Sequence, residues 1–305
     1  MTIGIAAYGP GAGRAVLDGV LATEILGRGA IGGFAVFSVL DERGEHHQVA
    51  CQEGGVAGLP GADTYRGAQC AAVISSGPNR PEPLSQFLVG RAGLGLVTGH
   101  RLPNRMGAAG RPVNVSALDR LSRGIAPAAA VRAELEDNPE LDFGLIAVTQ
   151  DGRIGFGNSA RVARRGDLIE ASRLEEGRGY ALLCNSIFFA AGLQPEVVIG
   201  DIVWSRLSDA PSRSFLAELA GPVPVSSAPE DRVELDGSGR VTRVYRAEPW
   251  LPDEPALTTV IYSQAPVWQD GKPIGLCLSE VFARLEKGCV TPDPACQARF
   301  AVERI

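Results

Sequence analysis

The chain has 305 residues, of which 45% are hydrophobic and 21% charged, the composition of a globular protein with one large domain or two modest ones. Its net charge of -6 at pH 7 gives no electrostatic support to nucleic-acid binding. The three His and six Cys, with no C-x-x-C spacing, offer little for a zinc site, so we expect no metal.

No targeting or membrane segment is predicted. The first 26 residues lack a basic start and a long apolar core, which excludes a secretory signal. No run of 18 apolar residues occurs, so we expect neither a transmembrane helix nor a membrane partner. A cytoplasmic location with reduced thiols is the default expectation.

The first half of the chain reads as strands and helices separated by glycine turns. A strand over 2–7 is followed by Gly9, Gly11 and Gly13, then by a helix over 12–26. That Gly-rich turn resembles a phosphate loop, but the third Gly of G-x-G-x-x-G would fall on Arg14, which favours a tight structural turn. The remaining predicted elements of this half are a hairpin over 34–40 and 46–52, a glycine-spaced strand over 93–101, helices over 115–121 and 127–135, and a hairpin over 143–149 and 153–157.

The second half is predicted to contain more hairpins and some short helices. The apolar run 180–191 predicts a buried helix. Two further short helices are expected over 212–219 and 278–285. Asp-Gly turns predict hairpins that join 232–235 to 240–245 and 258–263 to 274–278.

Antiparallel hairpins with segregated helices predict an α+β fold. The order of elements fits a four-layer α-β-β-α sandwich of two mainly antiparallel sheets. We assign residues 1–220 to this domain. A Pro- and Gly-rich loop then begins a hairpin-rich C-terminal extension, residues 221–305, which we expect to pack on the same domain.

Thr2 is the first candidate catalytic residue. If Met1 were removed, Thr2 would carry a free α-amine beside its hydroxyl, and the amine could act as the base for that hydroxyl. The alternative is an ordinary first-strand residue, because a β-branched side chain suits a sheet.

Three more candidates stand at predicted strand ends. Arg101 could hold a substrate carboxylate with its planar fork, or form a surface ion pair. His100 could bind substrate or act as a general base, or be a hydrogen-bonded structural His. Asn158 could stabilise an oxyanion, or fill a turn position.

The cysteines and the His pair give weaker signals. Cys184 and Cys51 stand in apolar runs typical of buried cysteines, and the alternative is a catalytic Cys with His100 as its base. His46 and His47 are neighbours in a strand, so their rings face opposite sides and a shared metal is not expected.

The first 160 residues resemble the head of the class II glutamine amidotransferases, which are N-terminal nucleophile (Ntn) hydrolases. The similar segments are Thr2-Ile3-Gly4-Ile5-Ala6, Gly27-Arg28-Gly29, Gly33-Phe34-Ala35-Val36-Phe37 and Gly93 to Arg101. The chain departs from the family in three respects: Thr2 replaces the Cys nucleophile, His100-Arg101 is one residue short of His-x-Arg, and Asn158-Ser159 is only the nearest equivalent of Asn-Gly.

The resemblance implies a small-molecule amidohydrolase that cleaves a C–N amide bond without a cofactor. Thr2 and Asn158 would be catalytic, and Arg101 and His100 would bind a carboxylate-bearing substrate. Two alternatives stay open: a non-catalytic Ntn-fold protein that binds a ligand or partner, and an amidase that uses an internal Cys. A homo-oligomer is compatible with the sequence.

Overall fold

The computed structural model describes residues 1–208, 210–248, 252 and 254–305. It divides into two units, Met1–Pro211 and Ser212–Ile305. The division falls before residue 220, where the sequence analysis placed it, because the strand β11 (Ser214–Glu218) pairs with the last strand, β20 (Arg299–Arg304), and therefore belongs to the C-terminal unit.

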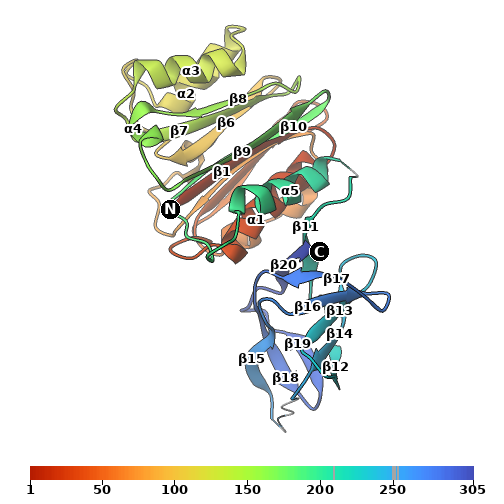
Figure 1. Cartoon of the computed structure of the whole chain (residues 1–305). Helices are drawn as coiled ribbons and strands as arrows, with labels where there is room; N and C mark the ends of the chain where they lie inside the picture. The colour runs from red at the N-terminus through yellow and green to blue at the C-terminus, as the bar shows by residue number, and fades with distance from the viewer. Residues whose placement is uncertain (209, 249–251, 253) are drawn as a thin grey trace. The chain divides into compact units, whose positions relative to one another are not determined.

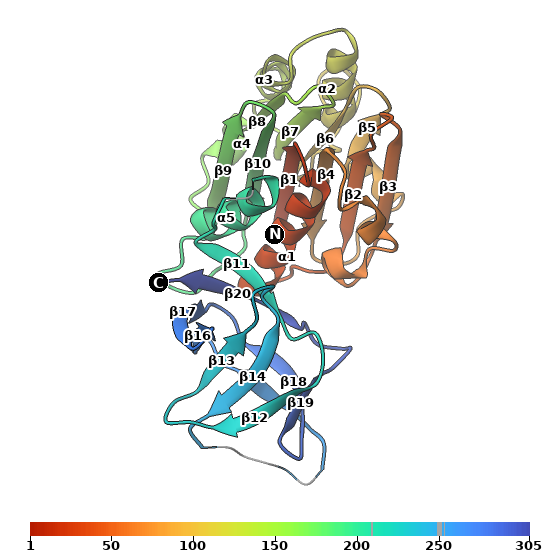
Figure 2. The same cartoon turned by 90° about the vertical axis from the view of Figure 1, so that its right-hand side faces the viewer.

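The N-terminal unit is built on a six-stranded antiparallel sheet with β1 (Thr2–Tyr8) near its centre, between β4 and β10. Figure 2 shows its strands side by side. Every residue of β1 is buried. The other strands, in sheet order around β1, are β3 (His46–Cys51), β2 (Ala35–Leu40), β4 (Cys70–Ser76), β10 (Arg178–Asn185) and β9 (Leu168–Glu175).

A second, four-stranded antiparallel sheet packs against the first. The core between them includes Ala6, Ile74 and Leu183 from the six-stranded sheet, and Leu96 and Ile146 from the four-stranded sheet. Alternate residues of each strand enter this core, as the two-residue period of a strand requires. The four strands, in sheet order, are β5 (Val89–Arg91), β6 (Gly95–Arg101), β7 (Phe143–Thr149) and β8 (Ile154–Asn158).

Helices cover the outer face of each sheet (Figure 1). The helix α1 (Ala12–Leu26) contacts β1 and β4, and α5 (Pro195–Leu207) contacts β9, β10 and α1. On the other sheet, α2 (Val113–Ser122) and α3 (Pro127–Asp137) bury apolar side chains against β6 and β7. The shorter helices are α4 (Ala160–Ala163) and the 3-10 turns η1 (Gly55–Gly58), η2 (Ala62–Tyr65) and η3 (Leu84–Phe87).

The C-terminal unit is a mainly antiparallel ten-stranded sheet with its own apolar core, which contains Val233, Val267 and Phe300. Two of its strand pairs, β12 with β14 and β13 with β16, are parallel. The strands besides β11 and β20 are β12 (Val223–Ser227), β13 (Arg232–Leu235), β14 (Val241–Arg246), β15 (Ala256–Ile261), β16 (Pro266–Gln269), β17 (Lys272–Cys277), β18 (Val281–Glu286) and β19 (Cys289–Pro292).

The predicted α+β class with antiparallel sheets is confirmed, as are the helix over 12–26, the two helices over 115–135 and the first two hairpins. Three predicted helices are wrong: 180–191 contains most of β10, 212–219 contains β11, and 278–285 contains most of β18. The fourth predicted hairpin is also wrong, because β15 pairs with β18, whereas β17 pairs with β16 and β20.

The wrong helix over 180–191 has a physical cause. β10 lies inside a sheet that is covered on both faces, so seven of its eight residues are buried and the run is almost continuously apolar. Such a run has no two-residue alternation to separate a strand from a buried helix.

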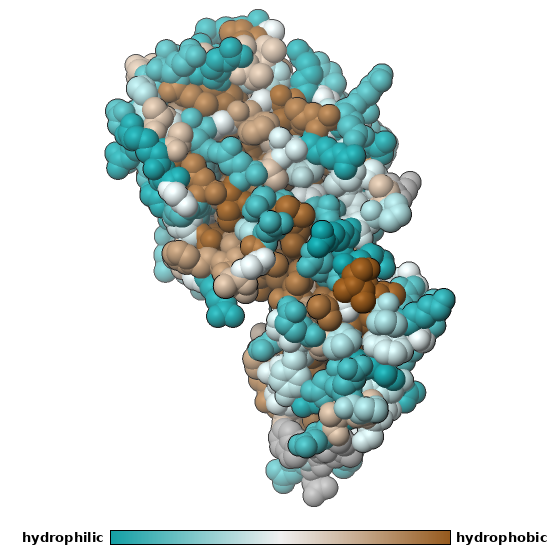
Figure 3. Space-filling view, in the orientation of Figure 1, coloured by the Kyte–Doolittle hydropathy of each residue, from teal (hydrophilic) through white to brown (hydrophobic). Residues whose placement is uncertain are grey.

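Apolar residues on the surface are interspersed with hydrophilic ones on the face of the N-terminal unit shown in Figure 3. Within the described part of the chain, no helix has the length and apolar character needed to cross a membrane.

Candidate functional site

Two rows of side chains face one another where β1 begins. Thr2 is paired in register with Ser76 on β4 and with Asn185 on β10. Ala6, two alternations further along β1, lies in the core between the sheets, so Thr2 points toward the four-stranded sheet. On that sheet, His100 of β6, Gly144 of β7 and Asn158 of β8 form the opposite row.

One contact joins the two rows: Nδ1 of His100 lies 3.0 Å from Oδ1 of Asn185. We call the six residues the inter-sheet site: Thr2, Ser76, His100, Gly144, Asn158 and Asn185. The structure therefore brings the predicted residues Thr2, His100 and Asn158 to one end of the N-terminal unit, although they are far apart in sequence.

Gly144 makes room for the row on the four-stranded sheet. A Cβ atom at this position would lie 2.5 Å from Nε2 of His100 and would also meet Oδ1 of Asn158. His100 and Asn158 therefore contact each other over the backbone of Gly144, where any side chain would collide with both.

Thr2 is enclosed by Ser76 and by the peptide group that precedes it. The residue is 3% exposed, and its Oγ1 lies 3.4 Å from Oγ of Ser76. The Ser76 hydroxyl donates to the carbonyl oxygen of Met1, and Nη2 of Arg80 donates to Oγ of Ser76 at 2.5 Å. Ser76 is therefore a hydroxyl donor aimed at a carbonyl oxygen, supported from behind by a guanidinium.

Positive charge converges on the chain terminus. The pKa of the Met1 α-amine is lowered first by partial burial, and then by the guanidinium groups of Arg101 and Arg80, with a smaller effect from Arg165. Arg80 is itself half-buried, which lowers its pKa, and none of its contacts among the described residues is with a carboxylate. The end of the site is electropositive.

Arg101 forms an internal ion pair. Its Nε lies 2.6 Å from Oδ1 of Asp142, and its Nη2 donates to Oδ2 of the same carboxylate. Burial acts to raise the pKa of Asp142, but the hydrogen bond and charge of Arg101 lower it on balance. The two-bond fork predicted for a substrate carboxylate is thus made with Asp142, the ion-pair alternative of the sequence analysis.

His100 is fully buried, and burial lowers its pKa to about 4, so the ring is neutral at pH 7. Its Nε2 lies 2.5 Å from Oδ1 of Asn158, whose amide Nδ2 donates to Glu170. The Glu170 contact fixes the orientation of Asn158, so Nε2 carries the ring proton. Because a neutral ring carries one N–H, Nδ1 then faces the Asn185 oxygen without donating a proton to it.

Polar contacts continue beyond Asn185. Its Nδ2 donates to Oγ of Ser186 at 2.9 Å, and the Ser186 hydroxyl donates to Oδ2 of Asp167 at 2.8 Å. Arg165 forms a two-bond fork with Asp167 and also contacts Ser186. The pKa of Asp167 is lowered to about 2, chiefly by the Arg165 hydrogen bond. A continuous series of polar contacts therefore links Asp167 to Glu170, passing through Ser186, Asn185, His100 and Asn158.

Two residues beside the site have a left-handed backbone conformation. Arg101 and Ser186, which directly follow His100 and Asn185, have φ angles of 64° and 56°. Non-glycine residues are uncommon in this left-handed region, and such conformations gather at functional sites.

Sequence reasoning missed Ser76, Arg80 and Asn185 as site residues. Ser76 is the last residue of an otherwise apolar strand and directly follows Ser75. Two polar residues at the end of an apolar run were the signal by which the sequence could have identified Ser76. Asn185 was missed because 180–191 was predicted to be a buried helix. That prediction did not place Asn185 on a strand, so it did not assign its side chain to one face of a sheet.

The cysteine alternative receives little support. Burial raises the pKa of Cys184 to about 12, and its side chain alternates with Asn185 and so points away from the site. Cys51 is half-buried, its pKa is raised first by burial, and its thiol donates to the carbonyl of Gly55 at 3.2 Å. Burial outweighs the effect of the nearby Met1 amine on Cys184, and it is the largest effect on Cys51, so neither thiol has the lowered pKa of an activated cysteine.

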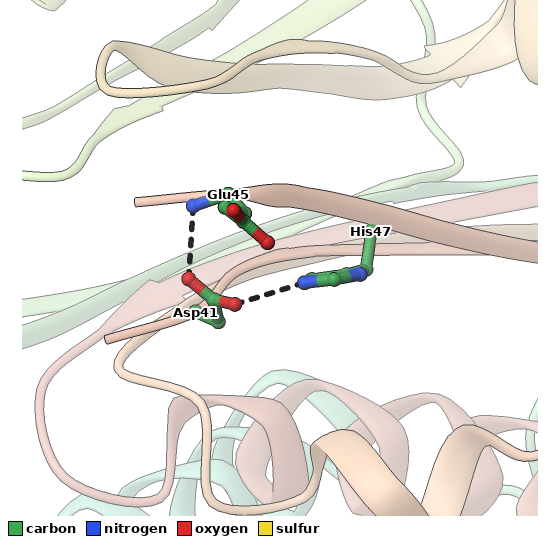
Figure 4. A group of neighbouring side chains, drawn as sticks. All are labelled: Asp41, Glu45 and His47. Atoms are coloured by element: carbon green, nitrogen blue, oxygen red, sulfur yellow. Dashed lines mark hydrogen bonds and ion pairs between the residues drawn. The ribbon is translucent and has the colours of Figure 1, made fainter. Parts of the chain in front are cut away.

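Asp41, Glu45 and His47 bring possible metal-ligand atoms within 4.8 Å of one another (Figure 4). Asp41 has a turn-forming role here, since its Oδ1 accepts the N–H groups of Arg43 and Glu45 at 2.9 and 2.8 Å. Its Oδ2 lies 2.9 Å from Nε2 of His47, whereas His46 is turned to Ser38 on the opposite face. The hydrogen bonds of Asp41 to the hairpin turn and its contact with His47 therefore explain why these side chains lie close together, and no ion is needed to hold them.

Comparison with known proteins places the N-terminal unit in a family but gives it no activity. The chain belongs to the family described as Domain of unknown function (DUF6963), whose model matches residues 2–215. Residues 222–297 are similar to a second family, described as Domain of unknown function (DUF7259). No curated protein matches the chain.

Proposed function

We propose that the N-terminal unit is a four-layer α-β-β-α sandwich of the Ntn-hydrolase class that cleaves a C–N amide bond in a small molecule. The observation that carries the proposal is the position of Thr2. It directly follows Met1, it begins a central strand, and its side chain lies on the face of that strand that packs against the four-stranded sheet, on which His100 and Asn158 stand.

The proposed chemistry uses Thr2 after removal of Met1. The Thr2 hydroxyl attacks the amide carbonyl carbon, and its proton passes to the freed α-amine. The tetrahedral intermediate collapses, the C–N bond breaks, and the leaving amine takes that proton. Water then hydrolyses the Thr2 ester, which releases the acid and restores the hydroxyl. The reaction needs no cofactor.

Ser76 is our proposed donor to the substrate carbonyl oxygen. In the chain with Met1 present, its hydroxyl donates to the Met1 carbonyl. Removal of Met1 would free this donor next to Thr2, with Arg80 behind it to strengthen it. The Asn158 amide, which the sequence suggested for this role, already contacts His100 and Glu170, so we assign it to positioning His100.

The charge of the site supports a substrate that bears a carboxylate. Arg101 and Arg165 already pair with Asp142 and Asp167. Arg80 has no carboxylate partner among the described residues, and it acts on the same amine. We therefore propose Arg80, in place of Arg101, as the cation that attracts the substrate.

A non-catalytic binding protein is the second candidate, and one contact favours it. The thioether of Met1 accepts the backbone N–H of Ala30 at 3.0 Å. A Cβ atom at Gly29 would collide with the same sulfur, so the Met1 side chain packs directly on this glycine. If Met1 stays in the native protein, no free Thr2 amine exists.

The test combines intact mass with a covalent probe. We expect the native protein to lack Met1, and a β-lactone to acylate Thr2, as located by peptide mass spectrometry. Thr2→Ala should abolish labelling and Thr2→Ser should retain part of it. Thr23→Ala is the matched control, because Thr23 is equally buried but its hydroxyl bonds to Gly19 within α1.

Two results would overturn the N-terminal mechanism. One is quantitative retention of Met1 in protein that releases amine from an amide. The other is unchanged labelling of folded Thr2→Ala. Retained Met1 without labelling would favour the binding protein.

A further inference from the structure

The C-terminal unit contains a cavity of about 210 Å³ that none of the preceding argument uses. Val244, Val260 and Leu285 belong to its apolar walls, and Arg246, Thr258 and Tyr262 supply polar groups. An apolar cavity of roughly 150 Å³ holds benzene in another protein. The present cavity is therefore large enough for a ring or short chain that carries one polar group.

The cavity lies between β14 and β15, two strands that are not hydrogen-bonded to each other. Val244 and Arg246 are two residues apart on β14, so both point into it. Arg243 and Tyr245 alternate with them and point to the other face. A contact from Nη1 of Arg246 to the carbonyl oxygen of Thr259, 3.4 Å long, spans the two strands.

Some N–H groups of Arg246 make no hydrogen bond with the described residues. Of the five N–H groups of a guanidinium, one donates to the Tyr262 hydroxyl at 2.9 Å and one to the Thr259 carbonyl. Nε is buried and makes no hydrogen bond with the described residues. It is in an ion pair with Asp231, whose Oδ1 lies 3.6 Å away and accepts the N–H of Ala247.

A partly buried guanidinium, with donors that make no hydrogen bond to the described residues, beside apolar walls indicates a class of ligand. An unsatisfied buried donor is costly, and a carboxylate is the acceptor that matches a guanidinium edge. We propose that this cavity binds a small monocarboxylate with an apolar body. The carboxylate pairs with Arg246, and the body packs against Val244, Val260 and Leu285. The site is separate from the inter-sheet site and does not depend on the proposed hydrolysis.

The proposal can be tested on the full-length protein by calorimetry with two matched probes. Benzoate has the ring and the carboxylate, whereas benzamide has the same shape without the charge. We expect millimolar or tighter binding of benzoate, and binding of benzamide about tenfold weaker, as for the loss of one charged hydrogen bond.

Three variants locate the site. Arg246→Met should weaken benzoate binding to the level of benzamide, and Arg243→Met, on the opposite face of β14, should leave it unchanged. Val244→Phe should abolish binding of both probes by filling the cavity while Arg246 remains, which covers the case in which Arg246→Met fails to fold.

Equal affinity for the two probes would overturn the assignment of a carboxylate ligand. Unchanged benzoate binding in folded Val244→Phe would overturn the cavity itself, and so would an absence of benzoate binding to the wild-type protein at high millimolar concentration.

Discussion

Gly144 controls the geometry of the inter-sheet site at the residue scale. Gly144→Ala should lower the free energy of unfolding by about 1–3 kcal/mol, because the new methyl group overlaps His100 and Asn158 and neither can move without losing a hydrogen bond. Urea denaturation measures the change. Gly166→Ala is the control, since its Cβ would meet no atom within 4 Å. Equal effects of the two substitutions would contradict the packing argument.

His100 makes stability depend on pH in a defined direction. Burial lowers its pKa from 6.5 to about 4 in the folded chain, so between these values the unfolded chain binds more protons. The free energy of unfolding should therefore fall as the pH drops from about 6.5 to about 4. In His100→Gln this contribution should disappear, which a series of denaturation curves at different pH would show. An NMR titration of His100 with a midpoint near 6.5 would refute the prediction.

At the scale of elements, Glu24 connects helix α1 to its neighbours. Its carboxylate accepts the Ser75 hydroxyl of β4 at 2.6 Å and the N–H of Val56 in η1. Burial raises its pKa from 4.5 to about 7, although both hydrogen bonds act to lower it. The folded chain thus holds a proton that the unfolded chain releases between pH 4.5 and 7.

The Glu24 contribution to stability should be present below about pH 4.5 and be lost as the pH rises to about 7. Glu24→Gln keeps an acceptor oxygen and removes the titration. Relative to this variant, the wild-type protein should lose about 1–3 kcal/mol across that interval, as measured by denaturation at each pH. This slope is opposite in sign to that of His100, so each variant isolates its own group. Parallel curves for variant and wild type would show that Glu24 does not titrate there.

At the scale of the whole molecule, the two units have separate apolar cores. Phe300 is fully buried in the C-terminal core. Phe300→Ala should destabilise that unit by about 3–5 kcal/mol, because it leaves a cavity. Hydrogen exchange should show faster exchange within 212–305 and little change in β1, β4 and β10. Equal loss of protection in both units would mean that they unfold together.

The sequence by itself determined the local elements whose signals are local. Helix α1 was predictable because glycines stand at both of its ends, and the β2–β3 and β7–β8 hairpins because polar turns with Asp separate two apolar runs. It also identified Thr2 as a candidate, because removal of Met1 would free its α-amine, and His100, Arg101 and Asn158, because they stand at predicted strand ends.

Only the tertiary structure decided which of these residues meet. The contact between His100 and Asn185 joins positions 85 residues apart, and the register of two different sheets sets it. The same register gave Arg101 an internal partner in Asp142 and placed Ser76 and Arg80 beside Thr2. Turns and helix ends are encoded by neighbouring residues, whereas strand order and sheet packing depend on burial summed over the whole chain, which no local pattern contains.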